Sequence, residues 1–151
     1  MEKSLLLNKF KSLSVQPEFV FLSTVNENGF PETRAMLNLR NPESFPKLKK
    51  YFDDNFISYF TSNTASQKLN HIVDANKASV YYVNPGTFEG LLFKGTIEII
   101  KDKALKENFW HENWTMYYKG GVSDPDYSLL KFTPEQYKYY NGDFKVSCGI
   151  L

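Results

Sequence analysis

The chain has 151 residues, and its 18 basic side chains nearly balance its 17 acidic ones. That length suffices for one domain with a sizeable apolar core, so we expect a single domain over residues 1–151. A formal net charge of +1 argues against a nucleic-acid partner, and the one cysteine, Cys148, excludes an intrachain disulfide and a cysteine-based zinc site. No apolar run approaches the roughly 20 residues of a membrane span, and no signal peptide is apparent, so we expect a cytoplasmic protein without a membrane partner.

The first elements in chain order are a predicted helix and a predicted hairpin. Leucine and phenylalanine recur at helical intervals over Ser4–Leu13, which indicates a short amphipathic helix. The runs "EFVFLSTV" (Glu18–Val25) and "FPETRAMLNL" (Phe30–Leu39) show the two-residue alternation of strands, and "NENG" between them supplies a turn. Apolar side chains fall on both faces of the first run, which predicts a strand with little exposed face.

Short helices and strands then alternate to the end of the chain. Predicted helices cover Lys47–Phe52, the segment from near Ala65 to Asn76, and Lys103–Trp114. Predicted strands cover Phe56–Thr61, Ala78–Asn84, Phe88–Ile100, Ser128–Pro134, Glu135–Gly142 and Phe144–Leu151. Many strands joined by short helices favour a mainly β fold, an antiparallel barrel that is closed or half-open. A doubly wound sheet would need a longer helix after nearly every strand.

Motifs of metal sites and of common hydrolases are absent. The sequence contains no phosphate-binding P-loop, no H-E-x-x-H and no G-x-S-x-G. His71 and His111 lie in different predicted helices, and neither has a partner at metal-ligand spacing. We therefore predict no metal site, and no catalytic residue is identified. A packed or surface position is the favoured interpretation of each histidine, with a haem ligand as the alternative.

The segment "YFTSNTASQKL" has the composition of a phosphate site. A strand is predicted to end at Thr61, and a hydroxyl-rich turn leads into a helix whose first N–H groups have no partner within the helix. Thr61 and Ser66 add hydroxyl donors there, and Lys68 adds a positive charge. The alternative is a capping box, in which Thr64 caps the helix and Gln67 occupies its third position. That alternative leaves Thr61, Ser66 and Lys68 unexplained.

A second candidate lies on the strand "TRAMLNL". Its alternation places Ala35 and Leu37 on one face, which suits a core, and Arg34, Met36 and Asn38 on the other. A guanidinium beside a thioether suits a flat ligand with an anionic tail, because arginine forks onto phosphate oxygens. The alternative is an exposed strand face with an incidental methionine.

The order of these features resembles a known family. Four stretches carry the resemblance: "FVFLSTVNENGFPETRAM", "YFTSNTASQKL", "VNPGTFEGLLFKGTIEII" and "FWHENWTMYYKGGVSDPDYSLLKFTPEQYKYYNG". Together they span almost the whole chain, and their order and spacing are more specific than any one of them. The chain resembles the FMN-binding split-barrel superfamily and, more narrowly, the pyridoxamine 5′-phosphate oxidase-like proteins of the bacterial general stress protein group.

The resemblance implies a six-stranded antiparallel split barrel that forms a homodimer, with two FMN sites at the subunit interface. It implies that Arg34, Ser66 and Lys68 hold the phosphate and that Thr61 reaches the flavin ring or its ribityl chain. The strand residues after Arg34 would line the isoalloxazine ring, and two tryptophans of the tail would approach it from this chain or from its partner. The implied cofactor-binding positions are Arg34, Ala35, Met36, Leu37, Thr61, Ser66, Gln67, Lys68, Trp110 and Trp114.

Three departures from the oxidase itself shape the functional expectation. Gln67 stands where the oxidase has an arginine, Glu89 stands before Gly90 where the oxidase has a glutamine, and nothing after Tyr140 resembles its substrate-binding tail. These departures argue against oxidation of pyridoxamine phosphate. We expect an FMN-binding oxidoreductase that acts on an unidentified small molecule. The alternatives are a non-enzymatic stress or sensor module that binds a flavin or haem, and a dimeric scaffold without a ligand.

Overall fold

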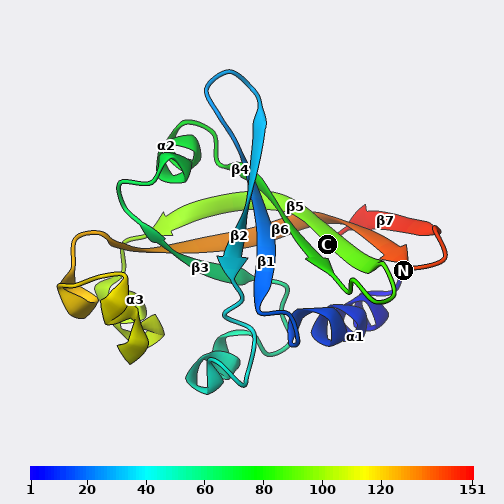
Figure 1. The fold of residues 1–151 in the computed structure, drawn as a ribbon. Coiled ribbons are helices and arrows are strands. Elements are labelled where there is room, and N and C mark those ends of the chain that lie inside the picture. The colour runs from blue at the N-terminus through cyan, green and yellow to red at the C-terminus, as the bar shows by residue number, and fades with distance from the viewer.

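Seven strands form one antiparallel sheet in the computed structural model, which describes residues 1–151. Along the sheet the order is β2-β1-β4-β5-β6-β3, and β7 pairs with β6 (Figure 1). The strands are β1 (Phe19–Val25), β2 (Pro31–Leu37), β3 (Ser58–Asn63), β4 (Lys77–Val83), β5 (Glu89–Ile100), β6 (Tyr127–Asn141) and β7 (Val146–Ile150).

Short helices lie around the sheet. They are α1 (Lys3–Ser14), α2 (Gln67–Asp74), α3 (Lys103–Phe109) and three 3-10 helices, η1 (Pro46–Tyr51), η2 (Glu112–Met116) and η3 (Gly121–Ser123). No helix is both long enough and apolar enough to cross a membrane.

The sheet curls into a half-barrel, which confirms the expected mainly β split barrel with short helices. β6 is 15 residues long, so one of its edges pairs with all of β5, while the other edge pairs with β3 and then with β7. The two strands at the ends of the sheet order, β2 and β3, contact each other. Six strands therefore form the curled path, and β7 extends it on one side.

Two apolar cores stabilise this arrangement. The barrel core holds 19 buried residues, and α1 contributes Leu6, Phe10 and Leu13 to it. The Phe10 ring packs edge-on against Tyr82 and Phe93, each with 5.0 Å between ring centroids. The second core holds 10 buried residues from η1, β3, α3 and the tail, and its members are mostly aromatic. These contacts explain the high aromatic content of 17%.

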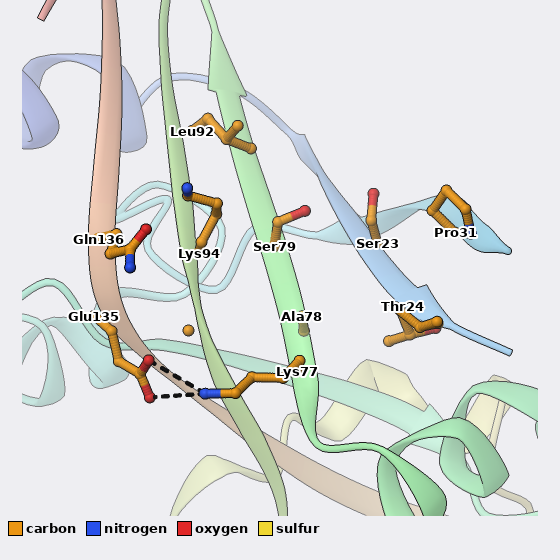
Figure 2. Close-up of a pocket in the computed structure, with 12 residues that line it drawn as sticks. Ser23, Thr24, Pro31, Lys77, Ala78, Ser79, Leu92, Lys94, Glu135 and Gln136 are labelled. Atoms are coloured by element: carbon orange, nitrogen blue, oxygen red, sulfur yellow. Dashed lines mark hydrogen bonds and ion pairs between the residues drawn. The ribbon is translucent and has the colours of Figure 1, made fainter. Parts of the chain in front are cut away.

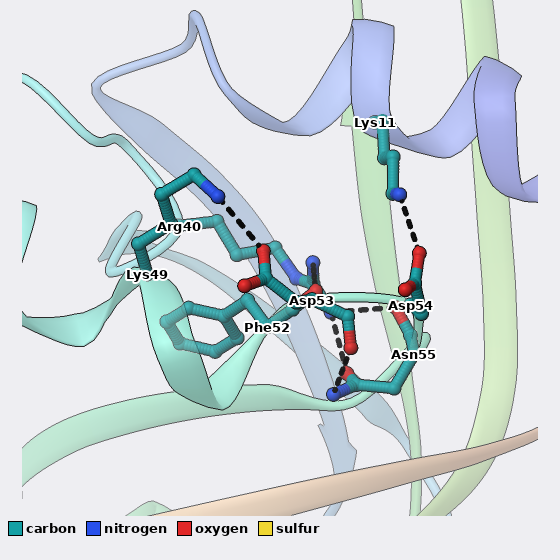
Figure 3. Close-up of polar contacts among 7 residues, drawn as sticks. All are labelled: Lys11, Arg40, Lys49, Phe52, Asp53, Asp54 and Asn55. Atoms are coloured by element: carbon teal, nitrogen blue, oxygen red, sulfur yellow. Dashed lines mark hydrogen bonds and ion pairs between the residues drawn. The ribbon is translucent and has the colours of Figure 1, made fainter.

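Arg40 joins the two cores. Its guanidinium lies between the Phe10 ring of the barrel core and the Phe52 ring of the second, 4.4 and 4.7 Å from the ring centroids. It donates hydrogen bonds to the carbonyl oxygens of Phe52 and Asn55 at 3.1 and 2.9 Å (Figure 3). It also donates to the carbonyl oxygen of Ile57 at 2.6 Å. Because these acceptors are neutral, burial lowers the pKa of Arg40 to about 10.

One expected pair of strands is a single strand. The prediction of separate strands over Ser128–Pro134 and Glu135–Gly142 is wrong, because β6 runs through both. The reason is a β-bulge: Lys94 of β5 pairs with Gln136, and Gly95 pairs with Pro134, so one residue of β6 is skipped. Pro134 has no N–H to donate, and a bulge lets the strand continue past it.

The helix expected over Lys103–Trp114 is also shorter than predicted. α3 ends at Phe109, Trp110 is extended, and η2 begins two residues later. The His111 side chain accepts a hydrogen bond from the Asn113 N–H, which starts the new helix and competes with continuation of the old one.

The expectation that β1 exposes little surface is wrong as well. Val20, Leu22 and Thr24 point into the barrel and are buried, as the alternation predicted. On the opposite face, however, the side chains of Phe19 and Phe21 are 49% and 40% exposed.

Candidate anion-binding site

The inner face of β2 differs from the predicted one. Met36 is buried in the barrel core, Arg34 is half-buried and Ala35 is exposed, so the alternation is right and the inward face is the opposite one. The core explains Met36 without a ligand. Asn38 is also buried, and its amide donates to the carbonyl oxygens of Ser14 and Pro17. Arg34 is therefore the one side chain of this face that still points to a ligand.

Arg34 binds only neutral acceptors within the chain. Its Nη1 donates to the Thr24 hydroxyl at 2.7 Å and, at 3.4 Å, to the carbonyl oxygen of Leu22, its partner across the strand pair. Its Nε and Nη2 donate to no protein group, and no carboxylate forms an ion pair with it. Burial lowers the pKa of Arg34, an effect that the charge of Glu32 opposes.

Lys68 lies beside Arg34. Its ammonium donates to the hydroxyls of Ser62 and Ser66 at 2.8 and 2.6 Å, and it forms no ion pair. Burial lowers the pKa of Lys68, and the positive charge of Arg34 lowers it further. Arg34 and His71 both bond the Thr24 hydroxyl, and Lys68 lies one helical turn before His71 on α2, so the structure brings two cations that lie 34 positions apart in the sequence into the same region.

The start of α2 explains why Ser66 is free to contact Lys68. The helix begins at Gln67 with Ser66 as its N-cap, and no side chain caps it. The predicted capping box is wrong, because the Thr64 hydroxyl donates to the Pro125 carbonyl oxygen and also bonds the Ser128 hydroxyl. Gln67 occupies the first helical position and is exposed. The first N–H groups of α2 therefore have no acceptor within the helix.

Four other predicted residues lie apart from the two cations. Thr61 is half-buried on β3. Burial raises the pKa of Tyr118, and the Thr61 side chain partly offsets that rise. Trp114 is buried in the second core, and Trp110 packs against it with 6.0 Å between ring centroids. Within this chain neither tryptophan contacts Arg34 or Lys68. Leu37, at the end of β2, packs against the second core.

The sequence identified Ser62 as one of the hydroxyl donors, but it missed three residues around the cations, which are Thr24, His71 and Glu32. Ser62 and Thr24 contact Lys68 and Arg34 directly, and both are buried. His71 contacts Thr24 and Glu32. The sequence indicated only that Thr24 lies on the inward face of β1. Nothing in it linked Thr24 to His71 of α2, 47 residues later. His71 is buried with both ring nitrogens engaged, which agrees with the packed interpretation rather than with a haem ligand.

A hollow of about 410 Å³ lies on the outer face of the sheet, over β1, β4, β5 and β6, and Thr24 of β1 and Pro31 of β2 are also among its lining residues. An ion pair between Lys77 and Glu135 lies at its edge (Figure 2). A neighbouring hollow of about 380 Å³ is lined by Phe21, Tyr81 and Tyr140, among others. None of the predicted cofactor-binding residues lines either of them.

The family follows from the sequence as a whole. The sequence profile described as "Pyridoxamine 5'-phosphate oxidase" matches residues 6–141, which is most of the chain. The chain belongs to this family. No curated protein sequence matches it.

Solved structures agree with this assignment. A protein from Clostridium acetobutylicum that is related to general stress protein 26 of Bacillus subtilis is 30% identical, with a TM-score of 0.81 over 100% of this chain and 97% of that one. General stress protein 26 from Bacillus anthracis is 21% identical, with a TM-score of 0.72 over 97% and 98% of the two chains.

Two more distant structures share the fold and differ in their ligands. A pyridoxamine 5′-phosphate oxidase-related, FMN-binding protein from Nostoc punctiforme is 17% identical, with a TM-score of 0.54 over 98% of this chain and 94% of that one. A haem-binding protein from Mycobacterium smegmatis is 11% identical, with a TM-score of 0.67 over 95% of this chain and 57% of that one.

Proposed function

We propose that this protein binds FMN and that Arg34 and Lys68 hold its phosphate. The observation that carries the proposal is the pair itself: two half-buried cations, linked through Thr24 and α2, share one region of the barrel, and neither has an ion-pair partner. Bringing like charges together in a partly desolvated place is unfavourable unless an anion completes the site. The uncapped start of α2 adds free N–H groups at the same place.

The available donors fit a phosphate ester. The free Nε and Nη2 of Arg34 provide a planar fork, and Lys68 provides a point charge that the Ser62 and Ser66 hydroxyls hold in position. Both cations together match the two negative charges of a terminal phosphate. Riboflavin lacks that group, so the site should favour FMN over riboflavin.

We propose a redox role on an unidentified small molecule. FMN, when bound, would supply hydride or electron transfer, while the protein would supply binding and orientation. The departures at Gln67 and Glu89 remain arguments against pyridoxamine phosphate as the substrate. A non-enzymatic flavin-binding module is the second candidate. The titratable groups near Arg34 are His71 and Glu32, and both ring nitrogens of His71 are already engaged, by Thr24 and by Glu32.

We further propose that a second copy of the chain covers the outer face of the sheet. Phe19 and Phe21 expose about half of their side chains there, and Tyr81, Leu92 and Tyr140 extend the same apolar face across β4, β5 and β6. Apolar surface of this extent on a sheet is typical of an interface.

FMN titration of the two single-alanine variants tests the phosphate assignment. We predict that Arg34→Ala and Lys68→Ala each weaken FMN binding about tenfold or more, because each removes a charge-assisted hydrogen bond worth roughly 1.5–3 kcal/mol. Flavin fluorescence and absorbance report the affinity. Lys3→Ala, at the exposed start of α1, removes the same charge far from the site and should leave the affinity unchanged.

Two results would contradict this proposal. One is wild-type protein that gives no spectral change up to millimolar FMN. The other is an affinity for FMN that stays within twofold in both variants. Anaerobic addition of NADH or NADPH to the FMN complex, followed by a quinone or oxygen, separates the two functional candidates: bleaching and recovery of the flavin spectrum support the redox role, and a stable oxidised spectrum supports the binding module.

A further inference from the structure

The Thr24 hydroxyl is shared by side chains from two different elements. Arg34 of β2 donates to it from Nη1 at 2.7 Å, and Nδ1 of His71 on α2 lies 2.9 Å from the same oxygen. The other ring nitrogen of His71, Nε2, lies 3.3 Å from a carboxylate oxygen of Glu32. Four side chains thus form one hydrogen-bonded series from Glu32 through His71 and Thr24 to Arg34.

The donors and acceptors fix which side chain donates each proton in this hydrogen-bonded series. A guanidinium only donates, so Thr24 accepts from Arg34 and keeps its own hydroxyl proton to donate. That proton is donated to Nδ1 when the histidine is neutral and carries its proton on Nε2. The carboxylate of Glu32 favours this tautomer, because it accepts from Nε2. In this arrangement the Thr24 hydroxyl and both ring nitrogens of His71 have partners.

The two middle members of this series, Thr24 and His71, are buried and link β1 to α2, while Glu32 and Arg34 at its ends are partly exposed. Thr24 and His71 are 1% and 5% exposed. His71 lies one helical turn after Lys68 on α2, so both side chains project from the same side of the helix. Thr24 lies on β1, beside the strand that carries Arg34. Burying the polar side chains of Thr24 and His71 costs free energy that an apolar pair would avoid. Neither residue is assigned to the phosphate, so this cost calls for another role.

We propose that Thr24 and His71 are positioning residues that hold the Arg34 guanidinium beside Lys68 in the absence of a ligand. Mutual repulsion would otherwise turn Arg34 away from Lys68, because β2 is an end strand and the guanidinium is only half-buried. The His71–Thr24 contact also fixes α2 against β1, and with it the spacing of the two charges. This inference rests on the proposed FMN function, since it assigns the two residues a role at the same phosphate site.

The selectivity for FMN over riboflavin measures this role. We expect Thr24→Val to reduce the ratio of the two affinities about fivefold to tenfold, because Arg34 loses the acceptor that orients it and only FMN has a phosphate to sense the change. Thr24→Ser keeps the hydroxyl and should restore the ratio. His71→Leu should reduce the ratio by a similar factor, and His71→Asn, which retains an acceptor near Nδ1, should restore part of it.

Thr33→Val is the matched control, because this exposed threonine of β2 bonds only Ser23 on the outer face, at 2.7 Å. Circular dichroism confirms that each variant folds, and if His71→Leu does not fold, the two Thr24 variants decide alone. A folded Thr24→Val with the wild-type ratio overturns the inference while FMN binding stands. If Arg34→Ala also keeps the wild-type ratio, the proposed phosphate site fails as well.

Discussion

At the scale of the single residue, the lowered pKa of Lys68 is the property that a bound anion would reverse. Burial and the charge of Arg34 lower its pKa below the ordinary value of 10.5. A phosphate beside the ammonium favours the charged form and raises that pKa again. We therefore predict that FMN binding takes up protons just below pH 10.5, where the free protein has lost part of the Lys68 proton and the complex retains it. Calorimetry in two buffers with different ionisation enthalpies measures the uptake.

Riboflavin separates this effect from ionisation of the flavin ring, since it has the same ring and no phosphate. The uptake specific to FMN should disappear in Lys68→Met and persist in Lys77→Met, which removes an exposed lysine. An equal uptake with both ligands would contradict the prediction. In the free protein, the Lys68 contribution to the free energy of unfolding should rise with pH between its lowered pKa and 10.5, because the unfolded chain then binds more protons.

Individual residues also mark the limit of prediction from sequence. Nothing in the pattern around Arg40 or Asn38 indicates burial, because their partners are backbone carbonyl oxygens 12 to 24 residues away. The link between Thr24 and His71 has the same origin. Arg34 and Lys68, in contrast, were identified from residue type and local context, and the structure places them together.

At the scale of the element, the bulge between β5 and β6 depends on Gly95. A methyl group on Gly95 would lie 2.1 Å from the backbone carbonyl oxygen of Thr133, which has no flexible side chain to yield. We predict that Gly95→Ala lowers the free energy of unfolding by about 2 kcal/mol or more, as overpacking in a well-packed core does. Chemical unfolding at a fixed protein concentration measures the change.

Gly86→Ala is the control for this prediction. Its added methyl group would lie 3.3 Å from the Asn84 side chain, in an exposed turn between β4 and β5. The two variants should therefore differ clearly in stability. Equal stabilities would mean that the bulge can shift to accommodate a side chain at Gly95.

Elements were predicted better than their orientation. The alternation along β1 and β2 located both strands and their hairpin, because a two-residue period follows directly from strand geometry. It did not determine which face of β2 points inward. Ala35 and Leu37 appeared more suitable for a core than Met36 beside Arg34, but the outer face of this sheet is itself apolar. The start of α2 was misplaced because the Thr64 hydroxyl bonds Pro125 and Ser128 instead of capping the helix. The end of α3 was misplaced because the His111 side chain binds the Asn113 N–H.

At the scale of the whole molecule, the exposed apolar face predicts the oligomeric state. We expect sedimentation velocity to give the mass of a dimer for the wild-type chain and a shift toward the monomer for Phe21→Glu, which places a charge in the centre of that face. Phe88→Glu changes an equally apolar side chain, 71% exposed at the turn before β5, and should leave the dimer intact. A wild-type monomer at micromolar concentration would contradict the proposed interface.

The proposed phosphate site lies between the two strands at the ends of the sheet order, so a bound phosphate would hold these strands together. β2 and β3 lie at opposite ends of that order and yet touch, and Arg34 belongs to one while Lys68 follows the other. A phosphate bound by both residues would connect β2 to β3, where the barrel is not closed by strand pairing. Dissociation of FMN and separation of these two strands would then be coupled, and the concentration of free FMN would affect the lifetime of the folded protein.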